Sequence, residues 1–146
     1  MPSALAWLLK LGLFPPRKLM AMAEKTVKIP GPDHPSTVGK NPDRVVVKAG
    51  DQVVADTRDA LSLQEASYPA VQYIPRKDVD FSLLERTEHE SYCPYKGEAS
   101  YYSVLPAGAD GVNAVWTYEQ PYDAVADIRE YVAFYPNKVT IEITTD

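Results

Sequence analysis

The sequence predicts a single β-rich domain of short strands and many turns, and three observations support this prediction. The chain has 146 residues, 45% of them hydrophobic, which suits one globular domain with a sizeable core. Proline occurs 13 times, and proline breaks helices and shortens strands. All ten tyrosines lie at or after Tyr68, and tyrosine suits half-buried pleated surfaces. We therefore expect a concavity lined with aromatic side chains.

The net charge of −5 argues against a nucleic-acid partner, because such binding needs a basic surface. Residues 1–21 hold three basic residues and no acid, so the remaining residues carry −8. The single cysteine, Cys93, has no partner for an internal disulfide, which favours a reducing compartment. We expect a cytoplasmic protein.

The first 21 residues are expected to form an extension outside the domain, which would span residues 22–146. Residues 4–14 are the most apolar stretch, but a membrane-spanning helix needs about 20 apolar residues. Lys10 interrupts this stretch, which argues against a signal peptide. The domain itself is expected to have no membrane contact.

The first half of the domain predicts a hairpin and further short strands. Residues 44–49 and 52–56 are two β-branched runs around a Gly50-Asp51 turn, which is typical of a β-hairpin. Residues 61–66 alternate, and residues 71–74 form a short apolar run before a proline, so both predict strands.

Two further segments of this half are less regular. His34 lies in a proline-rich turn, where a solvated loop residue is the simplest interpretation. Residues 81–86 fit either a helical turn or the start of a strand.

The second half predicts another hairpin, one helix and a last strand. Residues 98–105 and 112–119 alternate around a short loop, which would set Tyr101 opposite Trp116. A helix of about two turns is expected from Pro121, with four apolar residues at helical spacing: Ala124, Val125, Ile128 and Val132. Residues 139–143 predict the closing strand.

The reactive side chains gather in residues 89–102, which include the only cysteine and four tyrosines. One interpretation makes Cys93 a buried apolar residue, and another makes it a nucleophile whose thiolate is favoured by Lys96 or His89. In a strand Cys93 and Lys96 would point to opposite faces, but Pro94 suggests a turn where they converge.

The favoured hypothesis is a pocket for a small anionic molecule. Lys96 and Arg76 would attract the anion, and aromatic side chains would line the pocket. The candidate lining residues are Tyr73, Tyr95, Tyr101, Trp116 and Tyr118. The same aromatic residues also fit a plain core, or a face that binds another protein.

The residue types predict no metal, haem or other cofactor. Structural zinc takes four cysteine or histidine ligands, and the chain has three such residues. Asp78 and Asp80 lie on one side of an extended segment, as phosphoryl-transfer chemistry would use them, but no glycine-rich phosphate loop precedes them. A solvated acidic turn is the simpler interpretation.

Several short sequence words together carry a family resemblance that spans about residues 24–143. They are Ala66-Ser67-Tyr68-Pro69, Tyr73-Ile74-Pro75, Cys93-Pro94-Tyr95-Lys96-Gly97, Ala114-Val115-Trp116-Thr117-Tyr118, Pro121-Tyr122 and Ala133-Phe134-Tyr135. With them the chain resembles a widespread bacterial family of domains of unknown function, which some catalogues label a nucleotidyltransferase. The resemblance implies a compact, strongly curved antiparallel fold of β-barrel type, similar to that of methionine sulfoxide reductase B and a zinc-binding exchange factor. It implies no established activity.

Overall fold

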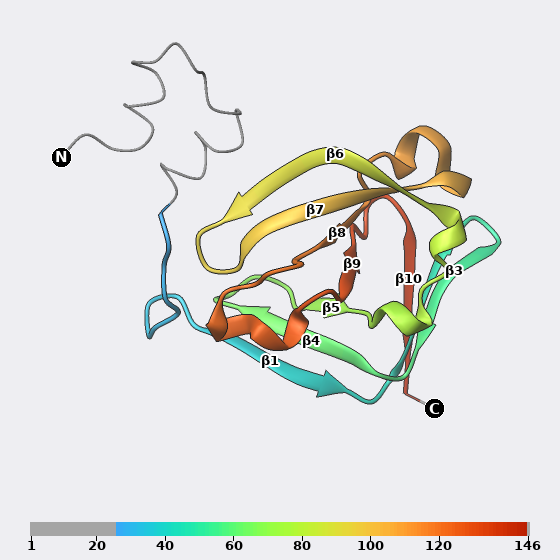
Figure 1. Ribbon diagram of the computed structural model, residues 1–146. Coiled ribbons are helices and arrows are strands. Elements are labelled where there is room, and N and C mark those ends of the chain that lie inside the picture. Colours follow the sequence, from blue (N-terminus) through green and yellow to red (C-terminus); the bar gives the residue numbers. More distant parts are fainter. Residues whose placement is uncertain (1–25, 146) are drawn as a thin grey trace, which may run out of the picture.

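The computed structural model describes residues 26–145, so the extension predicted at residues 1–21 lies outside the described residues. The described chain is mainly β, with four short 3₁₀ helices between the strands (Figure 1). The elements in chain order are β1 (Ser36–Asn41), β2 (Arg44–Ala49), β3 (Gln52–Thr57), β4 (Ala60–Glu65), β5 (Val71–Tyr73), η1 (Arg76–Asp78), η2 (Phe81–Leu83), β6 (Leu84–Cys93), β7 (Gly97–Val104), η3 (Leu105–Gly111), β8 (Val115–Thr117), η4 (Asp123–Ile128), β9 (Val132–Phe134) and β10 (Thr140–Thr144).

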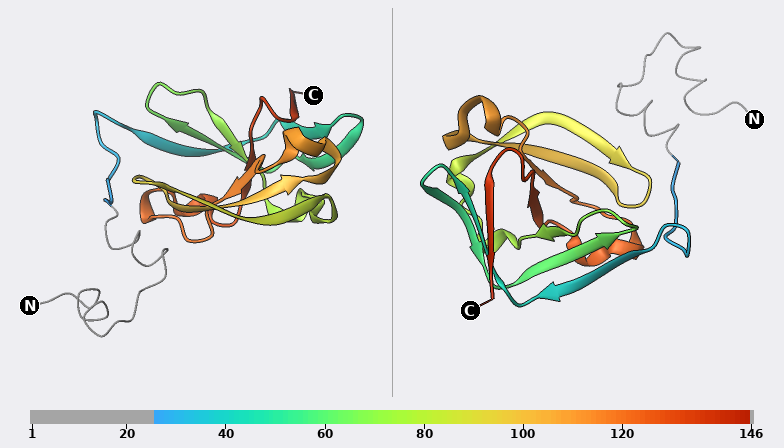
Figure 2. Two further views of the ribbon diagram at one scale, coloured as in Figure 1. Left: turned by 90° about the horizontal axis from the view of Figure 1, so that it is seen from above. Right: turned by 180° about the vertical axis from the view of Figure 1, so that it is seen from behind.

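The strands form three antiparallel sheets, in the orders β1-β4-β5, β10-β2-β3 and β6-β7-β8-β9. In Figure 1, β6 and β7 run along the top, β1 and β4 along the bottom, and β10 down the right side; Figure 2 shows this arrangement from above and from behind. Hydrogen bonds between Ile74 and Val132 join the end of β5 to β9. A second bridge joins Ala55 of β3 to Val79.

The expectation of a barrel is not met by the described residues, because their hydrogen bonds divide into three sheets and close no barrel. Two irregularities in the strand pairing bend these sheets. A bulge between Val47 and Lys48 bends the β2–β3 pair, and another irregularity between Arg86 and Glu90 bends the β6–β7 pair. The antiparallel and mainly β prediction is confirmed.

Both predicted hairpins are present. Strands β2 and β3 flank the Gly50-Asp51 turn, and Tyr101 of β7 pairs with Trp116 of β8. Strand β8 is shorter than predicted, because the connecting segment folds into η3. Residues 81–86 were expected to form either a helical turn or the start of a strand. They form both, because η2 leads directly into β6.

The predicted two-turn helix is wrong in its extent. Its start forms the 3₁₀ helix η4, which is interrupted at Val125 by non-helical backbone angles. Val132 does not continue the helix, because it is a strand residue that pairs with Thr117. The apolar spacing that suggested one helix arises because Val125 and Ile128 of η4 and Val132 of β9 are all buried, although they belong to two elements.

The core has two parts of different character. One is largely aliphatic, with valines from β2, β3, β7, β8 and β9. The other is rich in tyrosine and includes Tyr73, Tyr101 and Tyr118 around Leu63 and Ile128. In the described part of the chain, no helix is both long and apolar enough to cross a bilayer.

Candidate functional site

The turn between β6 and β7 sets the position of Lys96. Strand β6 ends at Cys93 and pairs with Gly97 at the start of β7, and the Lys96 amide donates to the Cys93 carbonyl at 3.2 Å. Gly97 has a φ of 112°, which side-chain-bearing residues rarely adopt, and an added Cβ would lie 3.3 Å from the Gln120 carbonyl. The tight turn brings Lys96 Nζ to 3.5 Å from Cys93 Sγ, so the predicted convergence of these two side chains is confirmed.

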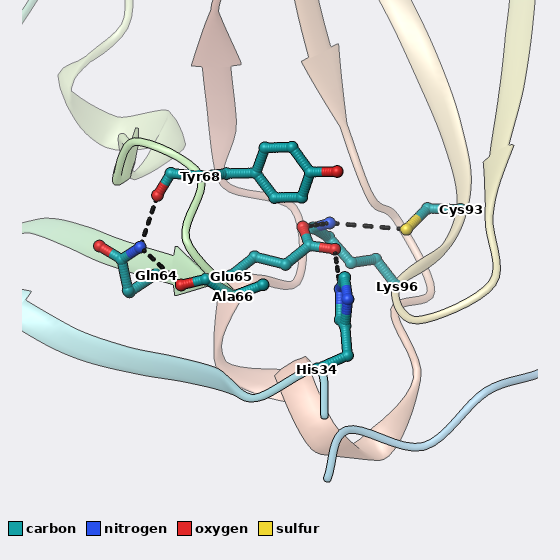
Figure 3. A network of polar contacts seen from close by, with 7 residues as sticks. All are labelled: His34, Gln64, Glu65, Ala66, Tyr68, Cys93 and Lys96. Carbon is teal, nitrogen blue, oxygen red and sulfur yellow. Dashed lines mark hydrogen bonds and ion pairs between the residues drawn. The ribbon is translucent and has the colours of Figure 1, made fainter. Parts of the chain in front are cut away.

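Lys96 is only 9% exposed and forms an ion pair with Glu65 at the end of β4. The ammonium donates to Oε1 of Glu65, and His34 Nε2 donates to the other carboxylate oxygen at 2.8 Å. Figure 3 shows Lys96 between Glu65 and Cys93, with His34 approaching Glu65 from the opposite side. A charged group so far from water needs such partners, because an isolated buried charge is strongly unfavourable.

His34 is part of this cluster, so its interpretation as a solvated loop residue is wrong. Its side chain is 26% exposed, and its ring stacks on Tyr95 with centroids 4.0 Å apart and planes 9° apart. The stacking fixes the ring while Nε2 holds Glu65. No local pattern indicates this contact, because His34 and Glu65 are 31 positions apart.

The environment of Glu65 keeps its carboxyl group ionised. Burial raises the pKa of this group, but the hydrogen bonds from Lys96 and His34 outweigh burial and hold the pKa below the ordinary value. At neutral pH Glu65 is therefore an anion beside the Lys96 ammonium.

The loop after β4 brings a further aromatic ring to the ion pair. The Gln64 side chain donates to the carbonyl oxygens of Ala66, at 3.2 Å, and Tyr68, at 2.5 Å. Ala66 takes a positive φ of 48°, which reverses the chain within this loop. Figure 3 shows the ring of Tyr68 beside the Glu65–Lys96 pair.

A cavity of about 210 Å³ opens next to the ion pair. Apart from Glu65 and Lys96, its lining is aromatic and apolar. Most of these lining residues belong to the tyrosine-rich core or pack against it. The remaining lining residues are Leu63, Tyr68, Pro69, Val71, Tyr73, Tyr101, Trp116, Tyr118 and Tyr135. Five of the residues expected from the sequence thus line one cavity: Lys96, Tyr73, Tyr101, Trp116 and Tyr118.

Tyr73, Tyr118 and Tyr135 of the cavity stay protonated at neutral pH. Burial raises the pKa of Tyr73 and of Tyr118 well above the ordinary value, and burial with a Tyr101 hydrogen bond raises that of Tyr135 to about 12. The Tyr73 hydroxyl accepts from Trp116 Nε1 at 3.2 Å, and the Tyr101 hydroxyl is 2.6 Å from Ser91 Oγ. Tyr73, Tyr118 and Tyr135 therefore contribute hydroxyl groups, not phenolates, to the cavity.

Tyr118 differs from the other tyrosines of the cavity. The residue is 6% exposed and lines the cavity. No fully buried side-chain oxygen of residues 26–145 lacks a hydrogen-bond partner, and no protein group of these residues bonds to the Tyr118 hydroxyl, so this hydroxyl reaches the cavity and is available to a bound molecule or water.

The other residues expected at the site lie outside the cavity. Arg76 is exposed on η1, with its guanidinium 4.3 Å from the centre of the Phe81 ring. Tyr95 supports His34, and Cys93 is half-buried behind Lys96. His89 is exposed, with its ring 4.4 Å from that of Tyr101.

Sequence reasoning missed Glu65, Tyr68 and Tyr135, although Glu65 left a signal. In the alternating segment of β4, Leu61, Leu63 and Glu65 fall on one face, so a carboxylate shares the face of two leucines. A charge on an apolar face needs a buried partner. That rule pointed to a cation elsewhere in the chain, but not to which one.

The two acidic residues considered for phosphoryl transfer, Asp78 and Asp80, have partners outside the cavity. Asp78 accepts from Thr57 Oγ1 at 2.7 Å and from Lys77, and Asp80 caps η2 through the Ser82 amide at 3.1 Å. Within residues 26–145, no three histidine, cysteine or acidic side chains are grouped closely enough to hold a metal ion.

Fold and cavity together define a small antiparallel β domain with a buried ion pair in an aromatic hollow. Residues 37–145 match the model of the family described as a domain of unknown function (DUF427), whose label names an NTP transferase. The match covers well over half of the chain, so the protein belongs to this family. No curated protein matches the chain significantly.

Proposed function

We propose that this domain binds a small molecule in the tyrosine-lined cavity and that Lys96 holds an acidic group of the ligand. The observation that carries the proposal is a lysine only 9% exposed that lines an aromatic cavity. Lysine is almost never so deeply buried without a specific partner, and its ammonium has three N–H donors. Among the described residues, two of these donors face Glu65 and Cys93, which leaves one for a ligand.

A purely structural ion pair is the competing explanation. Well-packed apolar residues often stabilise a core as much as a buried ion pair does, so the pair alone does little for stability. An ion pair beside an open cavity has a further use, because it presents charge where water is scarce and electrostatic contacts are strong. Arg76, which lies over Phe81 away from the cavity, takes no part in this proposal.

A thermal-shift screen of small carboxylates and phosphates tests the proposal. Acid-bearing compounds are expected to raise the melting temperature of the wild-type protein, while the matched alcohols or amides are not. Lys96→Met should abolish the shift, and Lys77→Met is the matched control because Lys77 also forms ion pairs with carboxylates, those of Asp59 and Asp78, but is exposed. No stabilising acid, or equal stabilisation of the Lys96→Met protein, would contradict the proposal.

A second candidate function is covalent catalysis by Cys93. The observation in its favour is the 3.5 Å distance between Lys96 Nζ and Cys93 Sγ, because a nearby ammonium favours the nucleophilic thiolate. This function predicts fast alkylation by iodoacetamide in the folded protein, slowed by Lys96→Met. A thiol that reacts only after unfolding would leave Cys93 a structural residue.

Three finer expectations remain predictions. Nucleotidyl transfer, suggested by the family label, would have to use Asp78 and Asp80, and it predicts nucleotide turnover that Asp78→Asn abolishes. The likeness to the methionine sulfoxide reductase B fold adds no activity to the proposal. A cytoplasmic location fits the free thiol of Cys93.

A further inference from the structure

The charged part of the cavity is a pair of opposite charges and not an isolated cation. Lys96 and Glu65 are hydrogen-bonded to each other, and both line the cavity. A ligand with one negative charge is attracted by Lys96 but also repelled by the neighbouring Glu65, which weakens its binding. A ligand that carries both charges gains from both contacts.

Both members of the pair keep hydrogen-bonding capacity for a ligand. The Lys96 ammonium has one N–H that neither Glu65 nor Cys93 takes up. Each carboxylate oxygen of Glu65 accepts one bond, from Lys96 or from His34, and each has a second lone pair. The pair can therefore receive a carboxylate at Lys96 and an ammonium at Glu65 together.

We infer that the ligand is a zwitterion with an ammonium and a carboxylate on one carbon, the head group of a free α-amino acid. This inference rests on the proposed function and names the class of ligand. The head group lies antiparallel to the ion pair, with the carboxylate on Lys96 and the ammonium on Glu65. The Tyr118 hydroxyl is a third polar contact at the same cavity.

The walls and the size of the cavity describe the rest of the ligand. Tyr68, Trp116 and Tyr135 provide aromatic surface, and the rings of Trp116 and Tyr135 are 4.6 Å apart. Such walls favour an apolar or aromatic side chain. The volume of about 210 Å³ is below the roughly 300 Å³ at which pockets for drug-sized ligands begin. One free amino acid fits this size better than a peptide or a nucleotide.

Three compounds that share a phenylethyl skeleton test the inference on the full-length protein. L-phenylalanine carries both charges, 3-phenylpropionate lacks the ammonium, and 2-phenylethylamine lacks the carboxylate. Titration calorimetry at neutral pH should find L-phenylalanine bound at least about tenfold more tightly than either single-charge compound, because only it satisfies both members of the pair.

The outcomes separate this inference from the proposed function. If 3-phenylpropionate binds as tightly as L-phenylalanine, the zwitterion is overturned and the acid-binding cavity stands. If 2-phenylethylamine binds most tightly, both are overturned. If none of the three binds, the inference is overturned, and the screen of carboxylates alone decides the proposed function.

Variants of the ion pair provide the second measurement. Glu65→Gln keeps the shape of the side chain and removes its charge, so the preference should shift toward 3-phenylpropionate. Lys96→Met should shift it toward 2-phenylethylamine. The readout is the ratio of affinities in folded protein, checked by near-ultraviolet circular dichroism of the tyrosines, so a loss of stability does not mimic it. Lys77→Met should leave the ratio unchanged, and unchanged ratios in Glu65→Gln would overturn the inference.

Discussion

Two lysine clusters of this domain have similar chemistry in different surroundings. Lys96 pairs with Glu65, and their side chains are 11% and 19% exposed. Lys77 pairs with Asp59 and Asp78, and its side chain is 62% exposed. Hydrogen bonds that Lys77 donates to both aspartates raise its pKa, yet water screens this cluster from the rest of the molecule. The comparison teaches that burial, and not the number of ion pairs, decides whether the contacts of a lysine hold neighbouring segments in place.

The largest effect is expected for Lys96→Met. The substitution leaves the Glu65 carboxylate in a mostly buried place with only His34 as partner, and such a loss typically costs about 3 kcal/mol. Urea unfolding at neutral pH should show a lower midpoint with an unchanged slope. A change in the free energy of unfolding of less than about 1 kcal/mol would mean that the Lys96 ion pair contributes no more than an exposed one.

A smaller, pH-dependent effect is expected for Glu65→Gln. The pKa of Glu65 is lowered from 4.5 in the folded protein, so its ionised form adds stability above that pH and loses it as the pH falls through the folded-state value. At neutral pH the free energy of unfolding of wild type should exceed that of Glu65→Gln by about 2 kcal/mol. This difference should shrink below pH 4.5. Urea midpoints of both proteins across this range measure it, and a constant difference would contradict the assignment.

Removing both charges should cost less than removing one. In Lys96→Met with Glu65→Gln, no buried charge is left without a partner, so stability should lie within about 1 kcal/mol of wild type. The same urea experiment gives the coupling between the two positions. A double variant as unstable as Lys96→Met would mean that packing of the lysine stem, not charge, holds this region.

The smallest effect is expected for Lys77→Met. Its ion pairs are exposed, and exposed pairs contribute little to stability. No shift of the urea midpoint should be measurable. A clear loss of stability would show that the link from Lys77 through Asp78 to Thr57 holds β3, and the contrast with Lys96 would weaken.

Local patterns were sufficient for the parts of the fold that are local. The Gly50-Asp51 turn and the pairing of Tyr101 with Trp116 followed from alternation and loop length. Such patterns failed where buried residues of two different elements happened to lie at helical spacing, as Val125 of η4 and Val132 of β9 do. Apolar periodicity records burial, and burial need not mean a helix.

The candidate site was predicted only in part for the same reason. Lys96 and Cys93 lie in one distinctive motif, residues 93–97, and the proline and glycine of that motif indicated the turn that joins them. Glu65 belongs to another sheet, 31 positions away, and no local signal names its partner. Arg76 was expected at the cavity from its charge alone, but a nearby phenylalanine ring holds its guanidinium elsewhere.

The long separations in this site also bear on how the chain folds. Contacts between residues distant in sequence close large loops, and they form more slowly than hairpins do. The β2–β3 and β6–β7 hairpins are local, but the Lys96–Glu65 pair and the Trp116–Tyr73 hydrogen bond join residues 31 and 43 positions apart. The cavity therefore comes into being only when separately formed sheets dock. A molecule bound there would recognise the finished domain and slow its unfolding, without speeding the early steps of folding.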